Sequence, residues 1–292
     1  MSQAILVTGS SSGFGRRISE TLAQQGHIVF ASMRDIGGKN ASVAQELTAW
    51  AAQSQLSLHV VELDVTNTAS VETAIAQIVN QTGRIDVVVN NAGFMVVGLS
   101  EACSLDQLQR MYDVNVFGAF RVNQAVLPHM RQQKSGLLLY LSSSGASLVY
   151  PFMGDYGSSK AALESLAATF YYETYSLGID TTIIQAGMYA TELAQNFQST
   201  ADQTRTASYG VVGHIAQEFI KGFPEALSAE RASDPQPVAD LVAELVQMPT
   251  GQRPLKAPIG AYTEGVIAVN QAIEPIQQYV LPGLGLDMLV KR

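Results

Sequence analysis

Hydrophobic and polar positions follow two patterns along this chain. Short apolar runs rich in Val, Ile and Leu predict strands at residues 4–9, 27–32, 56–63, 85–92, 136–143 and 180–186. Longer amphipathic stretches predict helices near residues 14–25, 41–54, 68–81, 105–131 and 156–177. The strand runs show little alternation, which is typical of strands buried on both faces. Together they predict an α/β fold, a single doubly wound parallel sheet with helices on both faces.

The pattern loosens after about residue 190. The stretch TELAQNFQSTADQTRTASYG (191–210) is polar and small, a helix is predicted after residues 234–237, and residues 250–292 hold several Pro and Gly. No linker-like or low-complexity segment divides the chain before that point. We therefore predict one domain over residues 1–292, with an insertion at about 192–235 and a tail at about 250–292.

Composition narrows the classes of function. The chain is 47% hydrophobic but has no apolar run near the length of a membrane span, and its net charge of -8 argues against a nucleic-acid surface. Cys103 is the single cysteine, which excludes an internal disulfide and a cysteine-based zinc site, and the histidines match no metal-ligand spacing. The first residues run directly into a strand without a signal-like segment. We expect a cytoplasmic protein without a metal, a membrane partner or a nucleic-acid partner.

A glycine-rich stretch, VTGSSSGFGRR, joins the first predicted strand to the first predicted helix. Glycines let the backbone approach a ligand closely, and the start of a helix offers N–H groups to a pyrophosphate. A flexible turn is the alternative. The position between strand and helix favours a dinucleotide-binding, Rossmann-like loop. We expect its contacts to come from Gly9, Ser11, Ser12, Gly13, Phe14 and Gly15.

The end of the second predicted strand carries a candidate for cofactor choice. Many NAD sites place an acidic side chain there to bind the ribose, whereas this chain has Met33 followed by Arg34. A guanidinium suits the 2′-phosphate of NADP, because its planar donors match phosphate oxygens. Asp35 follows directly and complicates the assignment, and Arg34 as an ordinary exposed loop residue remains an alternative.

In their joint order and spacing, several short motifs resemble the short-chain dehydrogenase/reductase family. They are TGSSSGFG (8–15), LDV (63–65), NNAG (90–93), Asn115 in NVFG, LSSS (141–144), Tyr156 and Lys160, and they cover roughly residues 3–191. The stretches ASMRD and YPFMGDY also resemble the branch that contains hydroxysteroid and retinol dehydrogenases. The resemblance implies further cofactor contacts from Asp64, Val65, Asn91, Ala92, Gly93, Gly187 and Thr191. The family's usual Pro-Gly turn reads AGMYAT here, so Ala186 replaces the proline and puts the rigidity of that turn in question.

The same resemblance implies a catalytic set of Asn115, Ser143, Tyr156 and Lys160. A ketone reduced by hydride needs a proton on its oxygen, and a tyrosine beside an ammonium group can supply it, because the cation lowers the phenol pKa. Lys160 lies one helical turn from Tyr156 and would also hold the nicotinamide ribose, while Asn115 would support a water linked to Lys160. Ser143 precedes Tyr156 at a spacing that is usual in the family and would stabilise the substrate oxygen, although its neighbours Ser142 and Ser144 are alternatives.

We therefore predict an NADP(H)-preferring oxidoreductase, with NAD(H) possible, acting on a carbonyl or secondary alcohol. A cofactor-sensing regulatory protein is the alternative, and an epimerase or dehydratase is a third. The expected pocket is apolar and favours a lipophilic substrate; its candidates are Met95, Val97, Ser144, Tyr150, Phe152, Met188, Tyr189, Phe197 and Tyr209. We also expect a homodimer or homotetramer with residues 105–131 and 156–177 at an interface, although core packing explains the aromatic side chains of the second helix equally well.

Overall fold

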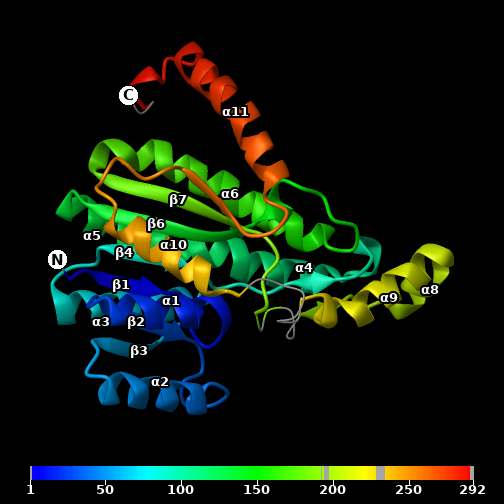
Figure 1. Cartoon of the computed structure of the whole chain (residues 1–292), viewed down its shortest axis with the longest axis horizontal. Helices are drawn as coiled ribbons and strands as arrows, with labels where there is room; N and C mark the ends of the chain where they lie inside the picture. The colour runs from blue at the N-terminus through cyan, green and yellow to red at the C-terminus, as the bar shows by residue number, and fades with distance from the viewer. Residues whose placement is uncertain (1, 192, 194–196, 228–233, 290–292) are drawn as a thin grey trace.

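The computed structural model describes residues 2–191, 193, 197–227 and 234–289. In this described part, seven parallel strands form one sheet in the order β3-β2-β1-β4-β6-β7-β9 (Figure 1). The strands are β1 (Ala4–Val7), β2 (Ile28–Met33), β3 (Leu58–Glu62), β4 (Val87–Asn90), β6 (Gly136–Ser143), β7 (Ile179–Ala186) and β9 (Lys256–Ile259). The predicted doubly wound parallel sheet is confirmed.

Helices cover the two faces of the sheet because successive strand residues point to opposite sides. Ile5 and Val7 of β1 join one core cluster, whereas Ala4 and Leu6 join the other. The first cluster is closed by α1 (Gly13–Gln24), α2 (Ala41–Gln53) and α10 (Gln236–Gln247). The second is closed by α3 (Thr68–Thr82), α5 (Gly118–Gln133) and α6 (Gly154–Thr174). The site is therefore carried by a sheet that is packed on both sides.

The helix predicted over residues 105–131 is not continuous. It divides into α4 (Leu105–Tyr112), a π-helical turn (Asp113–Phe117) and α5. The Arg121 side chain bridges this turn: it donates to the carboxylate of Asp113 at 2.7 Å and to the Val65 carbonyl at 3.2 Å. A π-helical turn rotates the side chains that follow it, and such turns are frequent at functional sites.

The predicted insertion holds more regular structure than its polar pattern indicates. Its strand β8 (Gln198–Ser199) pairs with β5 (Val96–Val97), and it continues into α8 (Gln203–Ser208) and α9 (Val211–Ala226). The β5–β8 pair fixes the start of the insertion to the segment that follows β4.

The predicted tail completes the sheet. Its strand β9 pairs with β7, and α11 (Glu264–Gly283) then extends away from the sheet (Figure 1). The last described element of the tail is a short 3-10 helix at Asp287–Leu289, and further 3-10 turns lie at Ser100–Ala102, Ser144–Ala146 and Tyr175–Leu177. Within the described ranges, no helix combines the length and apolarity needed to cross a membrane.

Candidate active site

Two loops meet at the carboxyl ends of β1 and β4, where the direction of the strand order reverses. Thr8 joins them: its hydroxyl accepts the backbone N–H groups of Asn91 and Ala92, each at 3.0 Å. The Asn91 amide donates to the carbonyls of Thr8 at 2.8 Å and Gly9 at 3.1 Å. In doubly wound folds this crevice is where nucleotides bind. Thr8 is absent from the predicted contacts, although it belongs to the motif TGSSSGFG.

Glycine is required in the first loop by close packing. Gly9 has φ of +69°, and a Cβ on Gly15 would lie 2.3 Å from the Gly9 carbonyl oxygen and 2.4 Å from Asn91 Nδ2. Ser12 is the extended N-cap of α1 but its side chain makes no capping bond, and Ser11 and Ser12 are both half-buried. The start of α1 thus lacks a side-chain cap and has a backbone that a ligand can approach. This arrangement fits a dinucleotide pyrophosphate.

In this loop only the backbone of Phe14 is placed to contact a cofactor, because its side chain packs elsewhere. Its ring packs edge-on against Tyr189, with the ring centroids 5.4 Å apart. That contact belongs to the core cluster on the α1 face. The side chain of Phe14 is therefore engaged in packing.

In the loop after β2, the charged groups of Arg34 and Asp35 have different surroundings. Arg34 is exposed, and no side chain in the described ranges accepts a hydrogen bond from its guanidinium. Asp35 has φ of +54°, and its carboxylate accepts the backbone N–H of Lys39 at 2.8 Å. Glu62 accepts the N–H groups of Asp35 at 2.7 Å and Ile36 at 2.8 Å. The Asp35 carboxylate is therefore used within its own loop, whereas the Arg34 cation faces solvent.

Asp64 and Val65 follow β3. The Asp64 carboxylate accepts from the backbone and the hydroxyl of Thr66, at 2.9 and 2.7 Å. Val65 is buried against α5: a Cβ on Gly118 would lie 2.8 Å from its Cγ2. Asp64 is thus held in place, and Val65 forms part of the core wall beside the predicted adenine position.

Tyr156 and Lys160 lie one turn apart near the start of α6, and both are buried. Lys160 Nζ donates to the Leu141 carbonyl at 2.8 Å and lies 5.8 Å from the centre of the Tyr156 ring. A side-chain hydrogen bond from Ser143 also acts on Tyr156. The structure brings these three predicted residues together. Leu141 is a further contact, which the sequence does not predict because it is made by a backbone carbonyl.

Burial dominates the acidity of this pair. It raises the pKa of Tyr156 to about 12, although the hydrogen bond with Ser143 acts in the opposite direction. It lowers the pKa of Lys160 to about 8, although the negative charge of Glu164 opposes that shift. The lowered phenol pKa that we expected from Lys160 is therefore wrong for this structure, because removal from water disfavours the phenolate more than the neighbouring groups favour it.

Asn115 lies in the π-helical turn and is almost fully buried. Its side chain accepts the Phe94 N–H and donates to the Phe94 carbonyl and the Ser159 hydroxyl, all at 3.0 Å. A Cβ on Gly93 would lie 3.1 Å from Asn115 Oδ1 and 3.6 Å from Lys160 Nζ. Asn115, Gly93 and Lys160 thus converge, and the π-helical turn gives Asn115 its place between the β4 loop and α6.

The turn after β7 is held by the tail. The Gly187 N–H donates to the Ile259 carbonyl at 2.8 Å, and a Cβ on Gly187 would lie 2.1 Å from the Ala261 carbonyl oxygen. Ala186, in place of the family's proline, is the last residue of β7 and lies beside Ile259 of β9. Neighbouring backbone therefore fixes this turn without a proline ring. Thr191 is half-buried beyond it.

An apolar cluster surrounds Tyr156. Four of the predicted pocket residues belong to it, namely Met95, Val97, Met188 and Phe197. The sequence analysis missed its other aromatic and methionine members, which are Phe94, Met111, Met153, Phe219 and Phe223. Phe152 reaches this group through Phe219, with ring centroids 5.5 Å apart. Phe219 and Phe223 lie on α9, whose helical pattern was not predicted.

The remaining predicted pocket residues lie elsewhere or are already engaged. Tyr189 packs with the α1 face, which separates it from the Tyr156 cluster. Tyr209 is exposed and donates its hydroxyl to Glu101. The Tyr150 hydroxyl donates to Ser144 Oγ at 3.3 Å, and Ser144 is buried. Tyr189 and Tyr209 therefore lie outside the cluster that contains Tyr156, since chain proximity does not fix the face on which a side chain points.

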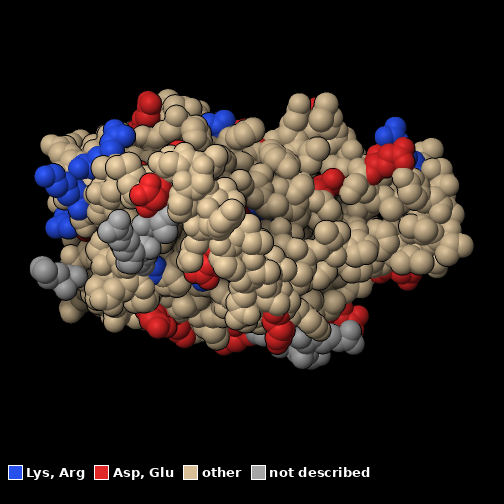
Figure 2. Space-filling model, turned by 90° about the horizontal axis from the view of Figure 1, so that it is seen from above, with Lys and Arg blue, Asp and Glu red and all other residues tan. Residues whose placement is uncertain are grey.

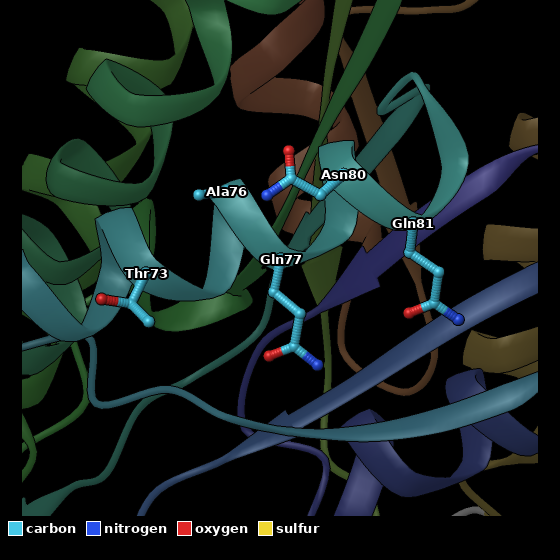
Figure 3. A pocket seen from close by; sticks show the side chains of 5 residues that line it. All are labelled: Thr73, Ala76, Gln77, Asn80 and Gln81. Carbon is cyan, nitrogen blue, oxygen red and sulfur yellow. The ribbon is translucent and has the colours of Figure 1, made fainter.

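A hollow on the outer surface of α3 does not belong to this site. Figure 3 shows its lining side chains along one helix: Thr73, Ala76, Gln77, Asn80 and Gln81. They carry no titratable group and come from a single element. Across the described residues there is also no cluster of three or more His, Cys, Asp or Glu side chains that could hold a metal ion.

Comparisons with known proteins agree with this geometry. The family model for short chain dehydrogenases matches residues 3–202. The chain is 32% identical over 248 residues to 17-beta-hydroxysteroid dehydrogenase type 1 of Mus musculus, covering 84% of this chain and 70% of the relative. It is 31% identical over 253 residues to retinol dehydrogenase 8 of Bos taurus, covering 84% and 78%.

A solved structure extends the likeness over nearly the whole fold. A short-chain dehydrogenase from Streptomyces avermitilis superposes with a TM-score of 0.75 and 26% identity, covering 97% of this chain and 98% of that one. The predicted family and its hydroxysteroid- and retinol-dehydrogenase-like branch are thereby confirmed. The chain belongs to the short-chain dehydrogenase family and is an NAD(P)-dependent oxidoreductase of that family.

Proposed function

We propose that this protein is an NADP(H)-preferring carbonyl reductase or alcohol dehydrogenase for lipophilic substrates, with Tyr156 as the general acid and base. The observation that carries the proposal is the placement of the Tyr156 hydroxyl. It bonds with Ser143, while the Tyr156 ring lies 5.8 Å from Lys160 Nζ and belongs to an apolar cluster that includes Met95 and Phe223. Acid–base groups and apolar side chains are thus neighbours at Tyr156.

The raised pKa of Tyr156 suits the reductive direction. A phenol with a pKa of about 12 keeps its proton at neutral pH, which is the form needed to protonate a carbonyl oxygen. Ser143 donates a second hydrogen bond to that oxygen as negative charge develops. When bound, the nicotinamide cofactor supplies the hydride to the carbonyl carbon or accepts it in the reverse direction.

Lys160 and Asn115 support this step in different ways. Lys160 places a cation beside the phenol and stabilises the phenolate that remains after proton transfer. It would also bind the nicotinamide ribose. Asn115 bonds to the Phe94 backbone and to Ser159, which fixes the surroundings of Lys160. It would also support a water through which Lys160 exchanges protons with solvent.

The cofactor would lie across the carboxyl ends of β1 and β4. Its pyrophosphate would contact the loop from Gly9 to Gly15, including Ser11, Ser12, Gly13 and Phe14. Its adenosine would lie by Arg34, Asp64 and Val65, and its nicotinamide half by residues 91–93, Gly187 and Thr191. The exposed Arg34 guanidinium favours a 2′-phosphate, and the engaged carboxylate of Asp35 removes the main competitor for that position.

Pocket chemistry supports a lipophilic substrate. The cluster around Tyr156 is made of aliphatic, aromatic and methionine side chains. Arg205 of the insertion is paired, since it lies 3.7 Å from Glu101 of the turn Ser100–Ala102 and 3.4 Å from Asp202. The relatives named above are designated steroid and retinol dehydrogenases, whose substrates are apolar. An uncharged, lipophilic ketone or secondary alcohol fits this lining best.

A ketone panel tests the proposal. Purified protein is assayed with steroid, long-chain and small polar ketones, each with NADPH and with NADH. We expect turnover of lipophilic ketones with a higher kcat/KM for NADPH. Cofactor binding without turnover of any ketone or alcohol would overturn the proposal and support the alternative of a cofactor-sensing regulatory protein.

We further propose a homodimer or homotetramer in the cytoplasm, built from one domain per chain. Phe117 and Phe120 are exposed on the segment that includes α5, and Phe120 packs near Phe170 of α6 with ring centroids 6.2 Å apart. Figure 2 shows that the middle of the face seen from above, where α11 lies, carries few charged side chains. Apolar surface of this kind is typical of contacts between subunits.

A further inference from the structure

Glu164 is a buried carboxylate that the proposed reaction does not use. It lies one turn beyond Lys160 on α6, with 7% of its surface exposed. Its Oε1 accepts from the Ser142 hydroxyl at 2.7 Å, and Gln185 Nε2 donates to both carboxylate oxygens at 3.1 and 3.0 Å. A carboxylate is costly to bury, so a role is expected where one is held by so many donors.

Glu164 belongs to a closed ring of polar side chains. Lys256 Nζ, on β9, lies 3.8 Å from Glu164 Oε2 and donates to Asn270 Oδ1 on α11 at 3.1 Å. Asn270 Nδ2 in turn donates to Gln185 Oε1 at 2.7 Å. The ring therefore connects the helix that carries Tyr156 to the edge strand and to the C-terminal helix.

The same ring approaches the catalytic set through β6. Three consecutive residues of this strand hold three residues of α6 that are spaced one turn apart. The Leu141 carbonyl accepts from Lys160, Ser142 donates to Glu164, and Ser143 bonds with Tyr156. Glu164 is thus fixed at one helical turn from Lys160, where opposite charges interact.

We propose that Glu164 is a positioning residue that keeps Lys160 in its ammonium form beside Tyr156. This inference rests on the proposed function, in which Lys160 acts as a cation. The charged or titratable groups facing Glu164 are Lys160 on α6 and Lys256 on β9, while β6, β7 and α11 present the neutral Ser142, Gln185 and Asn270. Lys160 itself faces Tyr156 and Glu164.

Electrostatics give the direction of the effect. Burial lowers the pKa of Lys160 to about 8, and the negative charge of Glu164 opposes that shift. Burial also raises the pKa of Glu164, whereas the donors Ser142 and Gln185 and both lysines favour its ionised form. Loss of the Glu164 charge should therefore let Lys160 release its proton at a lower pH.

The test measures the titration of Lys160 by NMR of protein labelled with 13C at the lysine side chains, with the Lys160 signal assigned by its loss in Lys160→Met. Glu164→Gln removes the charge and keeps the shape of the side chain. Glu164→Met also removes the charge but adds no hydrogen-bond donor, and it replaces the glutamine variant if that variant does not fold. We expect the Lys160 pKa to fall by about one unit in either variant. Glu164→Asp keeps a carboxylate, so the Lys160 pKa in that variant should stay close to its value in the unchanged protein.

Asn270→Ala is the matched control, because it opens the ring and leaves the Glu164 charge in place. A fall of the Lys160 pKa in the Glu164 variants but not in Asn270→Ala supports the inference. An unchanged pKa in the Glu164 variants, or an equal fall in Asn270→Ala, would overturn it and assign Glu164 to packing alone. The titration needs no substrate, so it decides this point even if every ketone fails as a substrate and the proposed function is wrong.

Discussion

Tyr156 keeps its proton because burial disfavours its phenolate form more than the neighbouring hydrogen bond from Ser143 stabilises it. Its pKa of about 12 makes it an acid in the resting protein, and it becomes a base only when further positive charge is brought close to it. Lys160 can lose its proton in an ordinary assay buffer, since burial lowers its pKa to about 8. The two residues share one helical face, and burial moves their pKa values in opposite directions because it favours the neutral form of each.

The pH dependence of the reduction rate should follow the protonation of Lys160. The ammonium form is present below its pKa of about 8 and is lost as the pH rises through that value, so reductive kcat/KM should fall on the alkaline side. Lys160→Arg keeps a cation at all practical pH values and should remove this fall, even if its overall rate is lower. The measurement is a pH–rate profile of both proteins. An unchanged alkaline fall in Lys160→Arg would assign it to another group.

Arg34→Ala should weaken the use of NADPH and leave NADH almost unaffected. A charge-assisted hydrogen bond contributes roughly 1.5–3 kcal/mol, which corresponds to about a ten- to hundredfold loss in kcat/KM with NADPH. Kinetics with both cofactors on the same ketone make the comparison. Asp35→Ala serves as a control, since its carboxylate bonds to Lys39 within the loop and its loss should not reverse cofactor preference. Equal losses with both cofactors in Arg34→Ala would mean that Arg34 only packs on the adenine.

At the residue scale, spacing predicts much of the candidate site. The separation of Ser143 from Tyr156 and the single helical turn from Tyr156 to Lys160 predict that these side chains lie together, as they do in the structure, because a strand end and a helix start have fixed geometry. The direction of the Tyr156 pKa shift was not predictable, since it depends on burial by α9 and the β4 loop. The same holds for Asp35, whose carboxylate is oriented by a local turn.

The elements that precede the insertion were largely predictable, because each central strand is a continuous apolar run. Two features were not. The break at Asp113–Phe117 leaves the apolar pattern of the helix intact, and within it Asn115 is buried and accepts the Phe94 N–H. The strand β9 contains Pro258 and has little apolar pattern, which an edge strand tolerates because one side lacks a partner.

Gly15→Ala tests the packing of the loop between β1 and α1. The added Cβ would lie 2.3 Å from the Gly9 carbonyl oxygen and 2.4 Å from Asn91 Nδ2, so the two loops must separate. We expect cofactor affinity to fall by about tenfold or more, together with a loss of about 1–3 kcal/mol in the free energy of unfolding. Fluorescence titration with NADPH and denaturant unfolding provide the two measurements.

Gly37→Ala is the matched control for this change. It lies in the loop after β2, where an added Cβ would meet no atom within 4 Å. This variant should bind NADPH and unfold as the unchanged protein does. Equal behaviour of Gly15→Ala and Gly37→Ala would show that the loop does not need the close approach that the structure describes.

At the scale of the whole molecule, apolar side chains remain on the surface after the sheet is covered. Phe117 is 50% exposed and Phe120 37% exposed, and Ile276 and Tyr279 of α11 are 61% and 83% exposed. The sequence predicts an interface from the length of its helices but does not predict that α11 stands away from the sheet. That arrangement depends on β9 and on the ring through Asn270.

Light scattering across micromolar concentrations should return the mass of a dimer or a tetramer. Phe120→Lys places a charge on the proposed interface and should shift the mass toward the monomer, because a buried unpaired charge opposes association. Thr73→Lys, on the outer face of α3, adds the same charge outside the proposed interface and should leave the mass unchanged. A monomer mass for the unchanged protein would contradict the proposed assembly.

The most direct test of the account is the turnover of Tyr156→Phe. This change keeps the ring in the apolar cluster and removes only the hydroxyl that lies beside Ser143. For a lipophilic ketone that the unchanged protein reduces, we predict that kcat falls by about 10²–10⁴-fold while the Kd for NADPH stays within about twofold. Turnover close to that of the unchanged protein would contradict the assignment of Tyr156 as the proton donor.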